Sequence, residues 1–342
     1  MPELDRTVMP DPRDVVIIGG GFAGLSAGVA LAEAGFRVAV LERKPKLGGR
    51  AYSFADPEGG DPVDNGQHVL MGCYTQTLDF LKKIGTYDQL IFRDRIEMEM
   101  IAPDGKRARL KTGWLPGPLH MVSALLRYRM LTVVERSSVL MAGAWLMALR
   151  RFGRKRLEKT TVTALLKQLH QSDHACECFW FPLAIATLNE DPERASAAVL
   201  AEVWGRAFFS RRRDSSFVYS KVGLSDLYCQ AAEDFIQERG GMVAARMAVE
   251  TLEMDGDHAV GCVRLRDGRK LEAANFVVAV PNGALLAMLP EPQQAEPFFA
   301  RLADLKQSPI ICVHVWLDRD VTDCAFVGFI GCTTQWLFNK RV

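Results

Sequence analysis

Two glycine clusters, separated by one acidic residue, constrain the fold of this chain more than any other feature. The run VVIIG, Val15–Gly19, is followed by Gly21 and Gly24, which completes the spacing G-x-G-x-x-G. After a buried strand, this spacing lets the chain turn tightly, bring backbone N–H groups to a pyrophosphate and pack the next helix closely. We therefore expect a strand at 15–18, then a helix that ends at Gly35.

The acidic residue between the clusters identifies the kind of ligand. RVAVLE predicts a second strand that ends at Glu42, eighteen residues after Gly24 (42 − 24). A carboxylate at this place can accept hydrogen bonds from both ribose hydroxyls of an adenosine. The order strand, glycine turn, helix, strand and acid predicts a dinucleotide site.

The second cluster, KLGGRAYS, returns the chain to the phosphate region through Gly48, Gly49 and Arg50. A second glycine turn with an arginine suits a longer cofactor whose pyrophosphate is held from both sides. The alternative is a plain surface loop in which Arg50 is solvated.

This arrangement resembles the FAD site of the flavin amine oxidase and phytoene desaturase superfamily. The resemblance implies FAD as cofactor, with Glu42 at the ribose, Gly21 at the pyrophosphate and Arg50 near the phosphates and flavin. In that superfamily a valine before a β-meander contacts adenine through its backbone, and Val249 matches it. The implied cofactor residues are Gly19, Gly21, Phe22, Ala23, Gly24, Glu42, Arg43, Gly49, Arg50, Gly66, Gln67 and Val249.

Further segments resemble the hydroxysqualene dehydroxylases, also called squalene-associated FAD-dependent desaturases. These segments are DPVDNGQHVLMGCY from Asp61, FPLAIATLNEDPERASA from Phe181, GLSDL from Gly223, and the late SPIICVHVWLD and TQWLF. The resemblance implies reductive dehydroxylation of 1-hydroxysqualene to squalene, with hydride from reduced FAD and a long, apolar, dry pocket for the isoprenoid chain.

The leaving hydroxyl in that reaction needs a proton or a hydrogen bond. His68 is the first candidate for a polar group near the flavin, and Asp64, Gln67 and Tyr74 are alternatives. A structural histidine bonded to backbone is an equally good interpretation of His68.

The expected fold class is α/β. A Rossmann-type FAD-binding domain, with a parallel sheet and a β-meander, is interleaved with a mostly helical substrate domain that contains a mixed sheet. MAVETLEM, HAVGCVRL and NFVVAV, separated by the turns DGD and DGRK, predict the meander and a strand that rejoins the parallel sheet. IICVHVWLD is expected to form a floor strand. The expected domains are 1–75 with 215–290, and 76–214 with 291–342.

One segment of the insert suggests a lipid surface. SSVLMAGAWLMAL, thirteen apolar or small residues, precedes the basic run RRFGRKR and follows a second amphipathic stretch. Thirteen residues cannot cross a bilayer, but a helix that dips into one leaflet, with cations at the headgroups, fits the pattern. A helical pair in the protein's own core is the alternative. We expect a cytoplasmic protein, peripheral on the inner face of the cell membrane.

Charge and cysteine content exclude other classes. The formal charge of +1 gives no general attraction to nucleic acid, and the eight scattered cysteines indicate reduced thiols. His170, His174, Cys176 and Cys178 resemble metal ligands, but their spacing fits zinc poorly. The run Arg211–Arg213 is either an anion patch or a solvated loop.

The superfamily pattern closes with a late Gly-Asp before a helix that faces the flavin phosphates. In this sequence Gly-Asp occurs only at Gly60-Asp61 and Gly256-Asp257, and nothing similar follows Pro281. We therefore expect the chain to lack the C-terminal FAD segment. An oxidative carotenoid or phytoene desaturase, and a non-catalytic membrane-associated flavoprotein, are the alternative functions.

Overall fold

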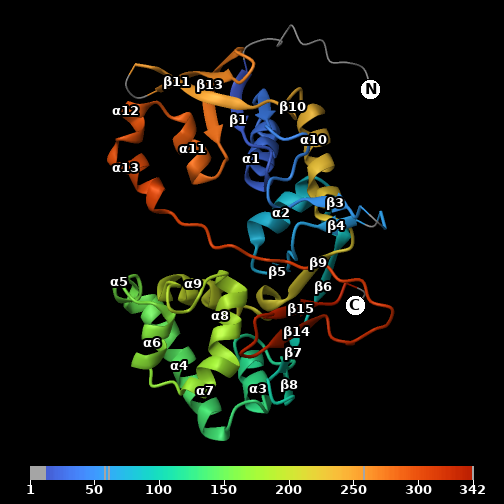
Figure 1. Ribbon diagram of the computed structural model, residues 1–342, viewed down its shortest axis with the longest axis vertical. Coiled ribbons are helices and arrows are strands. Elements are labelled where there is room, and N and C mark those ends of the chain that lie inside the picture. Colours follow the sequence, from blue (N-terminus) through green and yellow to red (C-terminus); the bar gives the residue numbers. More distant parts are fainter. Residues whose placement is uncertain (1–12, 58, 61, 257–258, 341–342) are drawn as a thin grey trace. The chain divides into compact units, whose positions relative to one another are not determined.

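The computed structural model describes residues 13–340 except 58, 61, 257 and 258. By its internal contacts the chain forms two compact units (Figure 1). The first unit contains the described residues up to His68, Gln76–Leu90 and Ser220–Gln307. The second contains Val69–Thr75, Ile91–Tyr219 and the described residues from Ser308 onward.

A six-stranded sheet with the order β10-β2-β1-β13-β12-β11 forms the centre of the first unit. Its strands are β1 (Arg13–Ile18), β2 (Val38–Leu41), β10 (Met242–Ala244), β11 (Val249–Asp255), β12 (Ala259–Leu265) and β13 (Lys270–Val278). β10, β2, β1 and β13 are mutually parallel, whereas β11 and β12 continue the sheet antiparallel. The predicted parallel sheet, the meander and the return of NFVVAV to the first strand are confirmed.

Both faces of this sheet are covered. Successive residues of β1 point to opposite faces, and all four residues from Val15 to Ile18 are buried. On one face lie α1 (Phe22–Glu33) and α10 (Gln230–Gln237). A Cβ on Gly28 would come within 2.8 Å of Ile236 Cδ1 and 3.1 Å of Val40 Cγ2, so the glycine lets α1 pack closely on α10 and β2. On the other face Val16 and Ile18 join the core that includes the end of α11 (Asn282–Met288).

Shorter elements complete the first unit. They are β3 (Ser53–Ala55), β4 (Pro62–Asp64), α2 (Thr75–Lys83), η1 (Tyr87–Gln89), the π-helix η4 (Ser225–Cys229), α12 (Glu291–Gln294), α13 (Pro297–Ala300) and η5 (Arg301–Asp304).

Contacts and expected domains differ at four places. Val69–Thr75 and residues 215–219 belong to the second unit by contacts, although the sequence analysis assigns both to the FAD-binding domain. Gln76–Leu90 and residues 291–307 belong to the first unit by contacts, although the sequence analysis assigns both to the substrate domain. Phe80 of α2 packs on the aromatic residue that starts α1, and Asn282 Nδ2 donates to the carbonyl of Leu302 (2.8 Å). The domain boundaries of the whole protein stay a prediction.

The second unit combines a four-stranded sheet with a layer of helices. The sheet, in the order β15-β14-β7-β8, is mixed, because β14 is parallel to β7 and the other pairs are antiparallel. Its strands are β7 (Glu97–Ile101), β8 (Arg107–Lys111), β14 (Phe326–Phe329) and β15 (Trp336–Phe338). A smaller sheet contains β5 (Leu70–Met71), β9 (Phe217–Ser220) and β6 (Leu90–Arg93).

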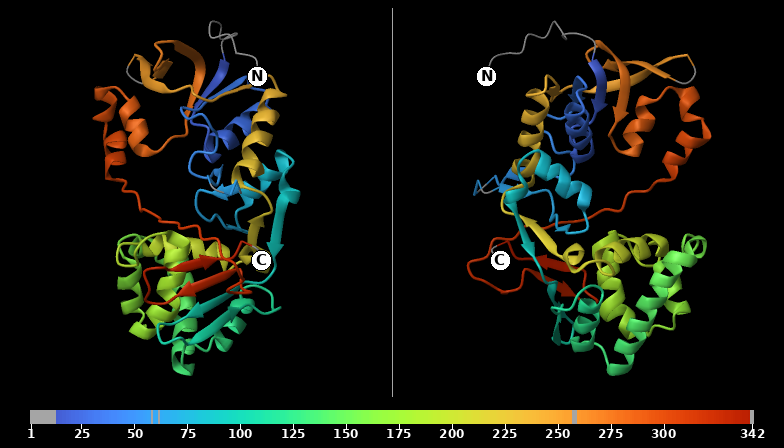
Figure 2. Two further views of the ribbon diagram at one scale, coloured as in Figure 1. Left: turned by 45° about the vertical axis from the view of Figure 1, so that its right-hand side comes forward. Right: turned by 180° about the vertical axis from the view of Figure 1, so that it is seen from behind.

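The helices of this unit lie on one side of the four-stranded sheet (Figure 2). They are α3 (Leu119–Arg127), α4 (Val133–Phe152), α5 (Arg154–Leu157), α6 (Val162–Gln168), α7 (Asp173–Ala175), the π-helix η2 (Cys176–Trp180), α8 (Phe181–Leu188), α9 (Ala197–Ala207) and η3 (Arg212–Ser215). Their core includes the stacked rings of Trp180 and Trp204, whose centroids are 5.0 Å apart. The predicted mostly helical unit with a mixed sheet is confirmed.

The two amphipathic stretches form α3 and α4, which pack on each other. α4 is longer than the thirteen-residue run and begins at a capping box made by Thr132 and Glu135. None of the helices in the described part of the chain has the length and apolar character that crossing a bilayer needs.

The prediction that IICVHVWLD forms a floor strand is wrong. Residues 310–318 have no helix or strand, and Ile311, Val313 and Val315 are 90%, 76% and 67% exposed. The alternation favours a strand, but a strand also needs a neighbour to bond, and none pairs with this segment within the described residues.

Candidate functional site

The first glycine turn joins β1 to α1, and two of its glycines have no room for a side chain. Gly19 has φ +109°, and a Cβ there would lie 2.5 Å from the Ala279 carbonyl oxygen. A Cβ on Gly24 would lie 1.8 Å from the Gly19 carbonyl oxygen. Gly21 is the N-cap of α1 and no side chain caps the helix, so its first N–H groups are available to an anion.

Glu42 follows β2 directly and is 6% exposed. Its Oε2 accepts from the Gly20 N–H (2.8 Å) and its Oε1 from the Lys44 N–H (2.8 Å). Each carboxylate oxygen keeps a second lone pair, so two ribose hydroxyls can still bind. The residue therefore fits its expected role.

The second glycine turn lies against the first. The Gly48 N–H donates to the Gly20 carbonyl (2.9 Å), and a Cβ on Gly49 would lie 3.0 Å from Gly21 Cα. Gly49 has φ +63°. Arg50 follows with an exposed side chain. The structure thus brings both glycine clusters together beside Glu42, which is the geometry that a bound pyrophosphate requires.

The motif around His68 contributes a buried polar atom without a partner. Gln67 Oε1 is buried and has no hydrogen-bond partner within the part of the chain that the structure describes. Such an atom costs free energy unless a ligand satisfies it. Gly66 has φ +91°, and His68 is exposed. These residues fit a cofactor that donates to Gln67; Asp61, which begins the motif, lies outside the described residues.

Asp64 serves the structure of this region. Its Oδ1 accepts from Ser53 Oγ (2.8 Å) and from the Leu224 N–H (2.9 Å) at the start of η4. The expected catalytic alternative Tyr74 belongs to the second unit and is 43% exposed.

The remaining expected cofactor residues surround the turns or follow them. Phe22 packs on Tyr228 with ring centroids 4.8 Å apart, whereas Ala23 and Arg43 are exposed. Val249 begins β11, just after the Met247 N–H donates to the Glu42 carbonyl (2.8 Å).

The sequence reading missed residues that hold the second turn. The single hydroxyl hydrogen of Tyr228 is shared between the carbonyls of Gly48 and Ala51, and Asn65 Nδ2 donates to the Arg50 carbonyl. The available signal was the GLSDL motif, which directly precedes Tyr228.

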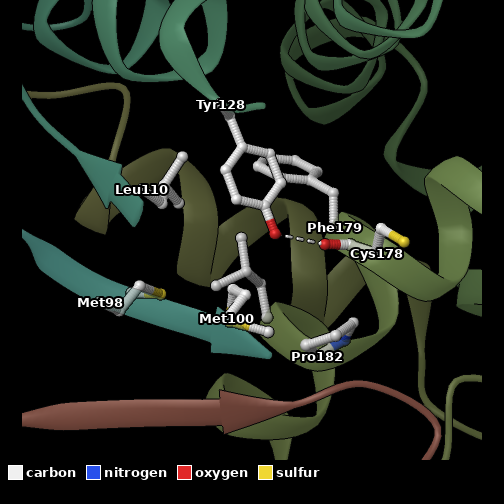
Figure 3. Close-up of a pocket in the computed structure, with 8 residues that line it drawn as sticks. Met98, Met100, Leu110, Tyr128, Cys178, Phe179 and Pro182 are labelled. Carbon is white, nitrogen blue, oxygen red and sulfur yellow. Dashed lines mark hydrogen bonds between the residues drawn. The ribbon is translucent and has the colours of Figure 1, made fainter. Parts of the chain in front are cut away.

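The second unit holds a small apolar cavity of about 10 Å³ (Figure 3). It is lined by Met98, Met100, Leu110, Tyr128, Cys178, Phe179, Pro182 and Leu183. The Tyr128 hydroxyl donates across it to the Cys178 carbonyl (2.8 Å). This volume is about that of one water, so the cavity cannot hold an isoprenoid chain.

A larger groove of about 320 Å³ lies over the LNEDPERAS segment and α9. The ion pair between Arg194 and Glu190 (2.7 Å) lies at its wall. The lining is partly polar and therefore unlike the dry pocket expected for the substrate.

Of the histidines and cysteines at 170–178, one histidine bonds a glutamate and both cysteines are buried. His174 Nδ1 bonds Glu135 (2.9 Å), and burial raises the pKa of the Cys176 thiol to about 11. Among the described residues no group of three or more His, Cys, Asp or Glu side chains could hold a metal ion.

The arginine run has aromatic neighbours that its sequence does not reveal. The guanidinium carbon of Arg212 lies 5.4 Å from the ring centroid of Trp114, and that of Arg213 lies 5.7 Å from the ring of Phe92. Their partners come from a segment about one hundred residues earlier.

A parallel α/β sheet with two apposed glycine turns and a buried acid after the second strand defines an FAD-binding flavoprotein fold. The chain belongs to the family of flavin containing amine oxidoreductases, whose family model matches residues 22–337. This membership confirms the predicted superfamily and FAD as the predicted cofactor.

Related proteins and solved structures are consistent with this family assignment. The chain is 28% identical over 319 residues to a 15-cis-phytoene desaturase of Synechococcus elongatus, covering 90% of this chain and 66% of the relative. It is 25% identical over 327 residues to a hydroxysqualene dehydroxylase of Rhodopseudomonas palustris, covering 95% and 73%. An oxidoreductase structure from Methanosarcina mazei has a TM-score of 0.65 at 16% identity, covering 85% and 65%. A putrescine oxidase structure has a TM-score of 0.62 at 19% identity, covering 83% and 62%.

The likeness to solved structures shows the fold alone. The chain spans 66%, 58% and 54% of the length of three phytoene desaturases that it matches.

Proposed function

We propose that this chain is part of an FAD-dependent oxidoreductase that reduces 1-hydroxysqualene to squalene. The apposition of the two glycine turns beside buried Glu42 supports the cofactor site. A long isoprenoid substrate is favoured by the names of the relatives, which include phytoene desaturases and a hydroxysqualene dehydroxylase. The motifs DNGQHVLMG and LNEDPERAS, which resemble the dehydroxylases, favour the reductive reaction.

The reaction exchanges one bond at an allylic carbon. The chemistry that reduced FAD supplies when bound is hydride transfer. The carbon–oxygen bond breaks, a carbon–hydrogen bond forms, and the hydroxyl leaves as water after it takes a proton, so the substrate gains two electrons. We assign that proton to His68, because the Asp64 carboxylate already accepts two hydrogen bonds that hold η4.

An oxidative phytoene desaturase is the second proposal, and it is favoured by the higher identity to the Synechococcus enzyme. That reaction removes two hydrogens from the substrate and passes two electrons to oxidised FAD. This reaction needs the same binding site for the adenosine and pyrophosphate of FAD as the dehydroxylation does.

One pair of incubations distinguishes these reactions. FAD-loaded protein is kept anaerobic with 1-hydroxysqualene and reduced FAD, and separately with phytoene and oxidised FAD, and products are identified by mass spectrometry. Squalene in the first supports dehydroxylation, and a product of phytoene two hydrogens lighter supports desaturation. If neither forms although the protein is yellow with bound flavin, this chain does not catalyse either reaction by itself, and a non-catalytic flavoprotein is supported.

We propose that α4 lies on one leaflet of a membrane. Val134, Met141, Trp145 and Phe152 are 78%, 64%, 56% and 85% exposed, and their spacing of seven, four and seven residues places them on one helix face. Arg151 and the basic residues of α5 adjoin the end of this stripe. An exposed apolar stripe beside cations is typical of interfacial helices. A surface on the inner face of the cell membrane, which carries anionic lipid, fits this charge.

Sedimentation with vesicles of anionic phospholipid tests this placement. Replacing Trp145 and Phe152 together by serine removes two large apolar groups, so we expect at least about tenfold weaker binding. Phe298→Ser is the matched control, because Phe298 is 72% exposed in the first unit. Equal binding of the double variant and the control would show that α4 does not touch the lipid.

A further inference from the structure

The second glycine turn is fixed through its carbonyl groups. The Tyr228 hydroxyl lies 2.9 Å from the Gly48 oxygen and 2.7 Å from the Ala51 oxygen, and Tyr228 is 1% exposed. Asn65 Nδ2 lies 3.0 Å from the Arg50 oxygen. Three of the four carbonyls from residue 48 to residue 51 therefore lie within hydrogen-bond distance of a side chain from outside the turn, and the Gly48 carbonyl also accepts from the Ala51 N–H (3.0 Å).

Holding the Gly48 carbonyl also aims the N–H of the same peptide, which belongs to Gly49. In a trans peptide the C=O and N–H point in opposite directions, so the Gly49 N–H points away from Tyr228. Neither the Gly49 N–H nor the Arg50 N–H has a hydrogen-bond partner among the residues that the structure describes. Free N–H groups in a turn with a positive φ residue form a concave anion site.

Tyr228 reaches the turn because it belongs to a π-helix. η4 precedes α10, and π-helical turns are uncommon and are often found at functional sites. Its start is tied to β3 by reciprocal bonds, from the Ser53 N–H to Ser225 Oγ (2.8 Å) and from the Ser225 N–H to Ser53 Oγ (3.1 Å). The GLSDL motif thereby places Tyr228 beside the turn.

We propose that Tyr228 and Asn65 are positioning residues of the cofactor site. They hold the second glycine turn so that the Gly49 N–H and the Arg50 side chain meet the pyrophosphate of FAD. The inference rests on the proposed FAD function. It states that the affinity for FAD depends on two residues whose side chains contact the turn and are not assigned to the cofactor. Both variants below test it by binding, without any substrate.

The test measures the Kd of FAD for deflavinated protein by fluorescence titration, together with the melting temperature. Tyr228→Phe removes only the hydroxyl, and Asn65→Ala removes one donor from an exposed side chain. We expect each to raise the Kd about tenfold, which equals about 1.4 kcal/mol.

Tyr128→Phe is the matched control. Tyr128 is also 1% exposed, and its hydroxyl also donates to a backbone carbonyl, in the second unit. Its loss should lower the melting temperature much as Tyr228→Phe does, because both leave a buried carbonyl without its donor. The Kd of FAD should stay within about twofold of wild type, since that hydrogen bond is outside the turn.

Each outcome supports or overturns the inference. If wild type binds FAD and both variants bind it equally well, the inference is wrong and the FAD site stands. If Tyr228→Phe does not fold, Asn65→Ala decides alone. If folded wild type binds no FAD, both the site and the inference are wrong. An equal loss of affinity in Tyr128→Phe would show that the effect is general destabilisation.

Discussion

Glu42 is a buried carboxylate with no ion pair in the described part of the chain, and two backbone N–H groups stabilise it. Glu42→Gln keeps the size but replaces one acceptor by an NH₂ group that would face a backbone donor. We expect the Kd of FAD to rise at least about tenfold, because a ribose contact and the turn at Gly20 are both disturbed. Titration with FAD measures this.

Glu33→Gln provides the control for this prediction. Glu33 lies at the end of α1, on the surface, where it pairs with Lys83. Exposed ion pairs contribute little to stability, so the loss of this pair should leave the Kd of FAD unchanged. Wild-type affinity in Glu42→Gln would mean that the carboxylate does not bind the ribose.

Single residues of the site differ in how well the sequence predicts them. Glu42 and the glycines are found because a short motif fixes their separation. Tyr228 is not found, because its hydroxyl bonds a carbonyl 180 residues earlier. Asn65 is not found either, because its motif does not show that its side chain reaches the Arg50 carbonyl. The aromatic neighbours of Arg212 are missed for the same reason.

At the scale of elements, the start of α4 depends on one carboxylate. Burial alone would raise the pKa of Glu135, but hydrogen bonds from Thr132, Ser172 and His174 outweigh it and lower the pKa to about 2 from its ordinary 4.5. A lowered folded-state pKa means that this stabilisation is present above about pH 4.5 and is lost as the pH falls toward 2.

Glu135→Gln should therefore lower the free energy of unfolding by about 1 kcal/mol at neutral pH. The amide oxygen can still complete the capping box, but the charge-assisted hydrogen bonds from Thr132, Ser172 and His174 to the carboxylate are lost. The difference in melting temperature from wild type should shrink as the pH falls from 5 toward 3. Glu158→Gln is the control, because its pair with Arg154 is exposed and should show no such trend. A difference that is constant with pH would contradict the assignment to Glu135.

Elements with complete local signals are predicted well. β1, α1 and β2 are marked by apolar runs and glycines, and the meander by its two turns. The segment at 310–318 has the alternation of a strand, but pairing depends on a neighbour that its own residues do not specify. The strand prediction fails there for that reason.

For the whole molecule, each unit has its own hydrophobic core. One core contains strands β1 and β2 with the meander, and the other contains the helices with strands β7 and β8. The motif between Asp61 and Tyr74 is divided between the two units after His68. The sequence predicts a Rossmann-type unit and a mostly helical unit, but not where the motif is divided between them. That division depends on contacts with distant segments, which the short motif does not encode.

The two cores predict two unfolding transitions that FAD affects differently. All six tryptophans, Trp114, Trp145, Trp180, Trp204, Trp316 and Trp336, belong to the second unit, so their fluorescence reports its unfolding alone. Circular dichroism reports both units. FAD at one hundred times its Kd should stabilise the first unit by about 2.7 kcal/mol. The midpoint seen by circular dichroism should rise while the tryptophan midpoint stays. At the same FAD concentration, an at least tenfold higher Kd in Glu42→Gln should reduce the stabilisation to about 1.4 kcal/mol or less. One common transition that FAD shifts in both signals would show instead that the units unfold together.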